Sequence, residues 1–307
     1  MAITINDTSY SGKYASPIIN KFTTDFATVN KGAIYVAEAR KALTIPTFNL
    51  TGLIQDRAAT PTSSGTGTVD KRVATPADQM VYWEFNPRDF ESHFEAEYLS
   101  EMLLKREISA EFLQAVQGAL TNYVNSRMDF QVWRSRTINT GDLKYYNGLI
   151  KKMLDDSDVV DIAGAAALSS SNIEAKLNLV KDAIPDAIYE HPDGKYIMNV
   201  EAGKFWADAQ RTASYKGAGM TERGILQFDG KPVITVPGLH EDTIVFTHAS
   251  NSIASNLWYV VNSTEDSMVQ YDFLQNNSEL MFFKMLYKAD TQYRYGSEIV
   301  LYTTQTA

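Results

Sequence analysis

Few residues of this 307-residue chain form a pattern that could do chemistry. There is no cysteine, which excludes thiolate nucleophiles, disulfides, iron–sulfur clusters and cysteine-bound zinc. A metal site needs several ligands that converge in space, and the histidines are scattered through the chain. Adjacent residues rarely face one site, so we interpret the densest polar group, His240-Glu241-Asp242, as a solvated turn. The four histidines are His93, His191, His240 and His248.

A second pattern, residues 224–232, resembles a phosphate-binding loop but lacks its essential parts. The spacing from Gly224 to Gly230 is one residue too long, and Pro232 replaces the hydroxyl that would bind magnesium. The pair Asp229-Gly230 instead favours a type I′ turn, so we predict a β-hairpin here. No Gly-x-Ser-x-Gly nucleophile elbow occurs. We therefore assign no catalytic, cofactor-binding or metal-binding residue, and we expect no cofactor and no enzyme activity.

The elements that would have to position such residues are a mixture of helices and strands. The chain is 44% hydrophobic, which is enough to bury a sizeable core. The strongest helix is predicted over 109–135, where Phe112, Val116, Leu120 and Tyr123 fall on one apolar stripe. A helix of this length would be roughly 40 Å long and would span a whole molecule.

Shorter elements follow the long helix. One helix is predicted to begin after Asn172 and to end at Pro185, and another covers 200–211. Strand-like segments separated by Gly, Pro, Asn and Asp dominate from 224 onward. No βαβ rhythm occurs, so we predict an α+β fold rather than a doubly wound parallel sheet. The predicted strands are 34–36, 43–45, 50–56, 72–86, 243–248 and 257–261.

One low-complexity segment, residues 57–70, contains a single large apolar residue, Val69. Such a segment cannot bury enough surface to order itself. It predicts a polar tip between the strands 50–56 and 72–86, which would make a long hairpin. A plain surface loop or a domain linker is the alternative interpretation.

Charge and hydropathy limit the class of protein further. The net charge is −9 and no block of Lys or Arg occurs, which argues against a protein that grips a phosphate backbone but not against one that encloses nucleic acid. No stretch is apolar enough to predict a membrane span, and the N-terminal residues do not resemble a secretory signal. The 17 tyrosines suit either large interfaces or ordinary β-sheet.

Taken in order, these elements resemble those of the tailed-phage major capsid family with the Hong Kong 97-type fold. Residues 72–82 (RVATPADQMVY) look like the descending strand of the family's E-loop hairpin, and residues 146–150 (YNGLI) look like the segment that follows its spine helix. Further similar segments are 195–199 (KYIMN), 230–233 (GKPV) and 288–302 (KADTQYRYGSEIVLY).

The resemblance implies a division of the chain. It assigns 1–49 to an N-terminal arm, 50–84 to the E-loop hairpin, 85–165 to a P-domain with the spine helix 107–136, 166–275 to an A-domain, and 276–307 to return strands of the P-domain. Some members of the family cross-link Lys to Asn between subunits. Lys71 and Lys231 are present, but no motif transfers that chemistry to them.

The function implied is that of a structural virion protein, the major capsid subunit. Hexameric and pentameric capsomers would form an icosahedral shell in the host cytoplasm and enclose double-stranded DNA without sequence-specific binding. The short arm predicts a separate scaffolding protein, and a portal and accessory capsid proteins are expected partners. Three alternatives stay open: an encapsulin-type nanocompartment shell, an α+β hydrolase that uses buried carboxylates, and a tyrosine-rich sugar-binding module.

Overall fold

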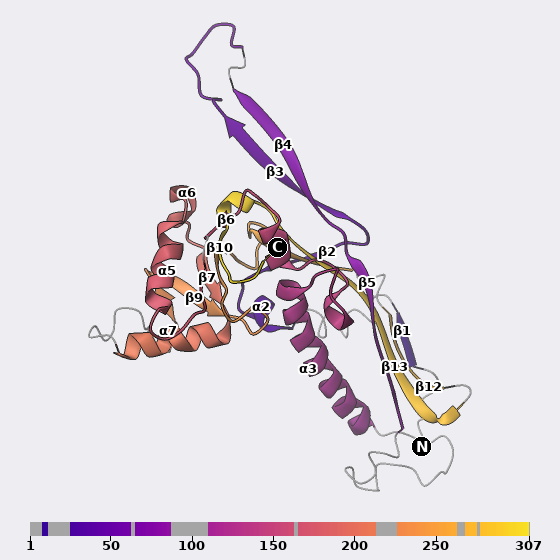
Figure 1. Ribbon diagram of the computed structural model, residues 1–307. Helices are drawn as coiled ribbons and strands as arrows, with labels where there is room; N and C mark the ends of the chain where they lie inside the picture. The colour runs from indigo at the N-terminus through magenta and orange to yellow at the C-terminus, as the bar shows by residue number, and fades with distance from the viewer. Residues whose placement is uncertain are drawn as a thin grey trace.

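The computed structural model describes residues 8–11, 25–62, 65–86, 110–162, 165–212, 226–262, 268–274 and 277–306. Helices and strands are mixed, which confirms the predicted α+β class. In these ranges the strands form two six-stranded sheets and one two-stranded hairpin, and the hairpin projects from the body of the molecule (Figure 1).

The first sheet is organised by its longest strand, β13 (Asn277–Tyr293), which pairs along its length with three others. Side chains at 281, 283, 285, 287 and 289 are buried, whereas those between them are half-exposed, so one face of the strand points into the core. The other strands of this sheet are β1 (Thr8–Ser11), β2 (Tyr35–Glu38), β5 (Ala77–Phe85), β11 (Leu257–Val261) and β12 (Met268–Leu274).

The long helix α3 (Ala110–Arg134) packs against the inner face of this sheet. Its buried stripe runs through Val116, Val124, Met128 and Val132, so the predicted stripe is wrong at Tyr123, which is 60% exposed. Steps of four residues from Val116 lead to Val124, whereas position 123 faces solvent on the adjacent side of the helix. Residues 107–109, where the spine helix implied by the resemblance begins, lie outside the described residues.

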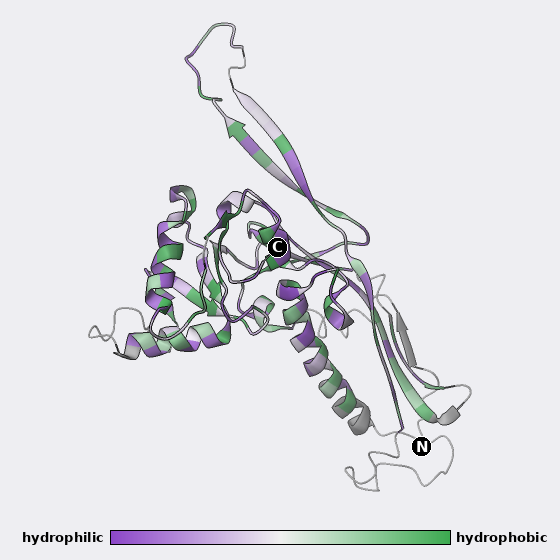
Figure 2. Ribbon diagram, viewed as in Figure 1, coloured by the Kyte–Doolittle hydropathy of each residue, from purple (hydrophilic) through white to green (hydrophobic). Residues whose placement is uncertain are grey.

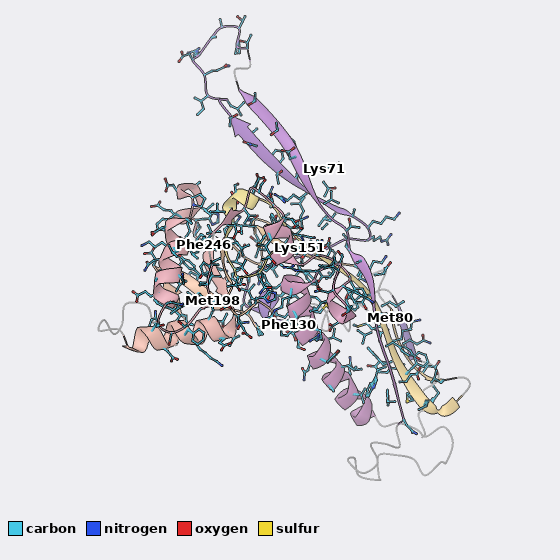
Figure 3. All side chains as sticks on the ribbon, in the orientation of Figure 1. Lys71, Met80, Phe130, Lys151, Met198 and Phe246 are labelled. Atoms are coloured by element: carbon cyan, nitrogen blue, oxygen red, sulfur yellow. The ribbon has the colours of Figure 1, made fainter. Side chains whose placement is uncertain are left out.

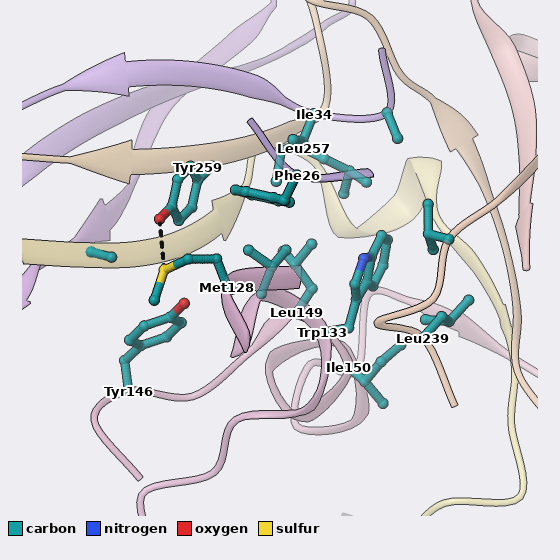
Figure 4. Close-up of a cluster of buried hydrophobic side chains, with 14 of the residues drawn as sticks. Phe26, Ile34, Met128, Trp133, Tyr146, Leu149, Ile150, Leu239, Leu257 and Tyr259 are labelled. Atoms are coloured by element: carbon teal, nitrogen blue, oxygen red, sulfur yellow. Dashed lines mark hydrogen bonds between the residues drawn. The ribbon is translucent and has the colours of Figure 1, made fainter. Parts of the chain in front are cut away.

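The core between α3 and the first sheet is closely packed (Figure 4). Trp133, Leu149 and Leu257 are completely buried in it, and the hydroxyl of Tyr259 donates to the sulfur of Met128 at 3.5 Å. The short helices α2 (Ala27–Asn30) and α4 (Leu149–Leu154) add side chains to the same cluster. The segment between α3 and α4 contains the 3-10 turn η4 (Gly141–Leu143).

A buried carboxylate ties α3 to two distant segments. Asp129 accepts hydrogen bonds from the backbone N–H and the hydroxyl of Thr28 in α2, at 3.1 and 2.5 Å, and from the backbone N–H of Gly238 at 2.6 Å. The indole N–H of Trp133 donates to the same Thr28 hydroxyl. One side chain therefore fixes α2 and the 237–239 loop onto the long helix.

The second sheet has the order β6-β14-β10-β7-β9-β8 and carries helices α5, α6 and α7, which lie together on one side of the molecule (Figure 1). Strands β7 and β9 are parallel neighbours joined through α7, so this half of the chain contains one βαβ crossover that the sequence analysis missed. The strands are β6 (Val160–Asp161), β7 (Gly194–Met198), β8 (Gln227–Phe228), β9 (Lys231–Thr235), β10 (Ile244–His248) and β14 (Val300–Tyr302).

The predicted shorter helices are confirmed. Helix α5 (Ile173–Asp182) begins after Asn172, and its predicted apolar face, Ile173, Leu177, Val180 and Ile184, is buried against the second sheet. Pro185 ends this segment and also precedes a four-residue helix, α6 (Asp186–Tyr189). Helix α7 (Val200–Thr212) matches the helix predicted over 200–211.

The hairpin consists of β3 (Leu43–Thr51) and β4 (Thr66–Ala74), so the predicted strand limits 50–56 and 72–86 are wrong. The C-terminal part of the low-complexity segment predicted as tip, residues 66–70, is strand, because pairing with β3 supplies the backbone hydrogen bonds that these residues could not find alone. The segment 72–86 contains parts of two strands. Strand β4 ends at Ala74, and Pro76, which lacks a backbone donor, separates it from β5.

Each sheet combines strands from distant parts of the chain. Strands β11 and β12, within the predicted A-domain 166–275, pair in one sheet with β13, and β14, within the predicted return strands 276–307, pairs with β10 in the other. The 3-10 turn η6 (Gly296–Glu298) carries the chain from β13 in the first sheet to β14 in the second.

Candidate assembly surface

Two of the histidines in the described part of the chain lie close together, and a third lies near two arginines. His93 lies outside the described residues, and His240 lies near Arg134 and Arg136. His191 and His248 come together, with ring centroids 4.7 Å apart, although no sequence pattern predicted this contact. Within the described ranges, no group of three or more His, Asp and Glu side chains could hold a metal.

The group His240-Glu241-Asp242 lies in a turn, as predicted, but only Glu241 is exposed, and the other two are half-buried. Burial, together with the nearby Arg134 and Arg136 guanidinium groups, lowers the pKa of His240 to about 4. The carboxylate of Asp242 accepts a hydrogen bond from the backbone N–H of Leu168 at 2.7 Å. The three side chains therefore serve separate contacts and do not converge.

The segment that resembles a phosphate loop is the predicted hairpin. Asp229 and Gly230 have φ angles of 52° and 72°, as a type I′ turn requires, and they join β8 to β9. The Lys231 amine donates to the carbonyl oxygen of His191 at 3.0 Å. Gly224 lies outside the described residues.

One face of the β3–β4 hairpin is an exposed apolar surface. Phe48 and Leu50 of β3 remain 51% and 58% exposed, and Phe48 lies directly opposite the exposed Val69 of β4. Val73 extends the same face toward the base of the hairpin. We call these four residues the apolar hairpin face. Apolar and polar residues alternate over 47–51 of β3, whereas β4 carries the charged run 70–72, whose Lys71 lies between Val69 and Val73 on the same face (Figure 2).

The opposite face of the hairpin is polar. Thr47 pairs with Asp70, Asn49 with Thr68 and Thr51 with Thr66 across the two strands. The hydroxyls of the last pair are hydrogen-bonded at 2.9 Å. The hairpin is therefore amphipathic, yet no described part of its own chain covers the apolar side.

The tip of the hairpin carries two further aliphatic side chains. Leu53 is half-exposed and Ile54 is completely exposed. The chain turns away from β3 at Gly52, whose φ of 65° is accessible to glycine without strain. Lys71 lies on the exposed part of β4 opposite Pro46, and its position on the projecting hairpin is visible in Figure 3.

A compact set of polar contacts anchors the base of the hairpin. The Arg72 guanidinium lies 2.5 Å from the Asp156 carboxylate and 4.5 Å from the ring centre of Tyr293. The Tyr293 hydroxyl donates to the same Asp156 oxygen at 2.8 Å. Burial alone would raise the pKa of Asp156, but hydrogen bonds from Asp158, Tyr293 and Arg72 outweigh burial and lower it. Asp156 therefore stays ionised as the partner of Arg72.

The C-terminal end of β13 contributes the remaining anchor contacts. Gln292 donates to the carbonyl oxygen of Val73 at 3.2 Å, and Arg294 donates to that of Pro46 at 3.1 Å. The backbone N–H of Phe48 donates to the Tyr295 hydroxyl at 3.4 Å. These contacts hold the half of the hairpin that lies nearest to the body of the subunit. The half that carries the tip extends beyond them.

A second exposed apolar surface lies on the outer face of the first sheet. Met80 and Tyr82 of β5 are exposed there, and the Tyr82 ring lies 6.0 Å from that of Phe282. Lys288 and Asp78 form an exposed ion pair at 3.6 Å on the same strands. By contrast, the tyrosines of the C-terminal strands, such as Tyr259, Tyr293 and Tyr302, are buried in the core.

No protein-family model matches the sequence, and no curated protein does. Solved structures do match. A chain of the satellite phage P4 procapsid aligns with a TM-score of 0.59 at 8% identity, over 95% of this chain and 99% of that chain. The capsid of an empty GTA particle aligns with a TM-score of 0.57 at 12% identity, over 90% and 88%. The chain has the Hong Kong 97-type capsid fold.

The predicted fold is therefore confirmed over nearly the whole chain. The fold also occurs in the SrpI encapsulin complex from Synechococcus elongatus, which aligns with a TM-score of 0.50 at 9% identity, over 89% and 87%. In the described residues, no helix is long and apolar enough to cross a membrane.

Proposed function

We propose that this chain is a structural virion protein, the major capsid subunit of a tailed phage. Copies of it would form hexamers and pentamers of an icosahedral shell that encloses double-stranded DNA. The fold is that of capsid shells, and the observation that carries the proposal is the projecting hairpin with one uncovered apolar face. Such a hairpin has no use in a compact enzyme, whereas a shell subunit needs long elements that reach its neighbours.

An isolated two-stranded hairpin is marginally stable in water, and this one extends beyond its anchor contacts. Full burial of a Leu or Phe side chain contributes about 1.5–3 kcal/mol. Phe48 and Leu50 are about half-exposed, so a neighbour that covered them would contribute roughly 2 kcal/mol from this pair alone. A second copy that binds in this way repeats the contact around a symmetry axis.

The elements take roles that match the family. We assign the E-loop to the β3–β4 hairpin, the spine to α3, the P-domain to the sheet around β13, and the A-domain to the sheet of β7, β9 and β10 with its helices. The assembled shell would be the virion capsid, formed in the host cytoplasm. A scaffolding protein, a portal and accessory capsid proteins are further expected partners.

An encapsulin-type shell is the second candidate, because the SrpI encapsulin complex shares the fold. The two functions differ in what the shell encloses. Nuclease-protected DNA in particles from the native source would favour the capsid, and an enclosed enzyme would favour the nanocompartment.

The test compares the two faces of the hairpin. We expect the expressed protein to form capsomers or megadalton particles by light scattering and electron microscopy. A Phe48→Ser, Leu50→Ser double variant should keep its circular dichroism spectrum but should not assemble. The matched control, Thr47→Ser with Asn49→Ser, changes the polar face of the same strand and should assemble normally. A wild-type protein that stays monomeric at high concentration, or a Phe48→Ser, Leu50→Ser variant that assembles as well as the control, would contradict the proposal.

A further inference from the structure

Contacts at the base of the hairpin show which of its backbone groups point outward. The Phe48 N–H donates to the Tyr295 hydroxyl, and the Pro46 carbonyl accepts from Arg294, so both groups point away from β4. Within a strand, the N–H and C=O of one residue point to the same side, and that side alternates along the chain. Pro46, Phe48 and Leu50 therefore form the outer edge of β3, and the residues between them hydrogen-bond to β4.

The register of the hairpin identifies the outer edge of β4 in the same way. Phe48 lies directly opposite Val69, so the N–H and C=O of Val69 also point away from the partner strand. Gly67, Lys71 and Val73 share this orientation, because each is an even number of positions from Val69. The Val73 carbonyl supports the assignment, since it accepts a hydrogen bond from a side chain at the end of β13.

The edge of β4 is more open than the edge of β3. On β3, Pro46 has no N–H, and the N–H of Phe48 is already bound. On β4, both backbone groups of Gly67, Val69 and Lys71 lack a hydrogen-bond partner among the described residues, and all three residues are exposed. A row of unpaired N–H and C=O groups on an exposed edge is a template for another strand.

We propose that the outer edge of β4 pairs antiparallel with the same edge of a second copy, across a two-fold axis at Val69. Val69 would hydrogen-bond to Val69 of the second copy, and both hairpins would become one continuous sheet. Such a contact is isologous, because each copy gives and receives the same hydrogen bonds. A sheet of three or more strands with an apolar face is stable where a single hairpin is marginal. The inference rests on the proposed function in one respect, which is that the two copies are subunits of one shell.

The side chains along the edge select this register. Lys71 faces Gly67 of the second copy, so the two lysines do not meet. Thr68 faces Asp70 of the second copy, and its hydroxyl can donate to that carboxylate. An axis at Asp70 or Lys71 would place like charges directly opposite, which is destabilising. An axis at Thr68 would shorten the pairing, because the strand begins at residue 66, so the proposed axis gives the longest pairing without a like-charge pair.

Single cysteines test the register, because the chain itself has none. Val69→Cys should form disulfide-linked dimers when assembled protein is mildly oxidised, since the Cα atoms of a hydrogen-bonded pair are about 5.5 Å apart. The matched controls, Thr68→Cys and Asp70→Cys, would each place their two cysteines on diagonal positions, about 7–8 Å apart. Each control alone should therefore stay monomeric on a denaturing gel without reductant. A mixture of the two should form mixed dimers, because residue 68 faces residue 70 of the second copy.

Val69→Pro tests the backbone of the edge. It removes the central N–H of the edge but no hydrogen bond within the hairpin, because this N–H points away from β3. Two hydrogen bonds between the copies are lost at the axis, so the concentration needed for assembly should rise about 10- to 30-fold. Val69→Thr keeps the N–H and the shape of the side chain and should assemble near the wild-type concentration. Circular dichroism and hydrogen exchange of β3 check that the hairpin is retained in both variants.

The pairing is overturned if Val69→Cys stays monomeric in oxidised particles, if all three cysteine variants form dimers alone, or if Thr68→Cys forms them in its place. Loss of assembly in Val69→Pro without dimers of Val69→Cys would assign the edge to a different strand, which also overturns the pairing. The proposed function fails separately, when the wild type forms no particles. Dimers of Val69→Cys in concentrated protein that forms no particles would support the pairing and contradict the shell.

Discussion

Replacing Arg72 by Met should release the hairpin from the body of the subunit while leaving the two cores intact. Arg72 is the residue of β4 that contacts both Asp156 and Tyr293, and no other side chain of the described hairpin forms an ion pair with the body. Methionine keeps much of the aliphatic contact of the arginine side chain but removes its charge and its donors. The change therefore tests the anchor rather than the packing.

The expected magnitude follows from the exposure of the pair. The side chains of Arg72 and Asp156 are 26% and 16% exposed, between a surface pair worth about 0–1 kcal/mol and a buried pair whose disruption costs about 3–5 kcal/mol. The stacking of the guanidinium on Tyr293 adds about 0.5–1 kcal/mol. A total near 2 kcal/mol would raise the population of the detached hairpin roughly 30-fold.

Hydrogen exchange measured by mass spectrometry resolves this change by segment. In Arg72→Met, exchange in peptides from β3 and β4 should accelerate roughly 30-fold, because a detached two-stranded hairpin protects its amides poorly. Peptides from β10 and β11, in the cores, should exchange as in the wild type. Arg127→Met is the matched control, since Arg127 pairs with Asp142 near α3 and does not contact the hairpin.

Two results would contradict the anchoring role of Arg72. Unchanged hairpin exchange in Arg72→Met would mean that the backbone contacts of Gln292, Arg294 and Tyr295 hold the hairpin without the ion pair. Equal acceleration in β3, β4, β10 and β11 would mean that Arg72 stabilises the whole fold rather than the hairpin.

Further predictions concern the long helix. A Cβ at Gly238 would lie 2.0 Å from the carbonyl oxygen of Asp129, so Gly238→Ala should lower the unfolding free energy in urea by more than about 3 kcal/mol. A Cβ at Gly118, within α3, meets no atom within 4 Å, so Gly118→Ala should raise it by about 0.5–1 kcal/mol. Asp129→Asn should cost about 2–4 kcal/mol in the same assay, because one of three buried donors would then face an amide N–H. Wild-type stability in Asp129→Asn, or equal effects at the two glycines, would contradict these assignments.

Local patterns in the sequence were sufficient to predict several helices, strands and turns. The apolar face of α5, the Asp229-Gly230 turn and the runs of β10 and β11 follow from spacing and from turn chemistry over a few residues. The order of these elements also sufficed to predict the fold, because order and length persist where individual residues do not. The alternation of Phe48 and Leu50 with Thr47, Asn49 and Thr51 was a period-two signal that could have located β3 correctly.

The tertiary structure alone decided which residues meet and which surfaces stay uncovered. His191 and His248 are 57 positions apart in the chain, and Arg72 meets Asp156 across 84 positions, so no local pattern could link them. Residues 66–70 became a strand only because β3 pairs with them. The apolar hairpin face was equally invisible in sequence, because alternation predicts one buried side for a strand, and only the three-dimensional arrangement shows that this chain leaves that side open.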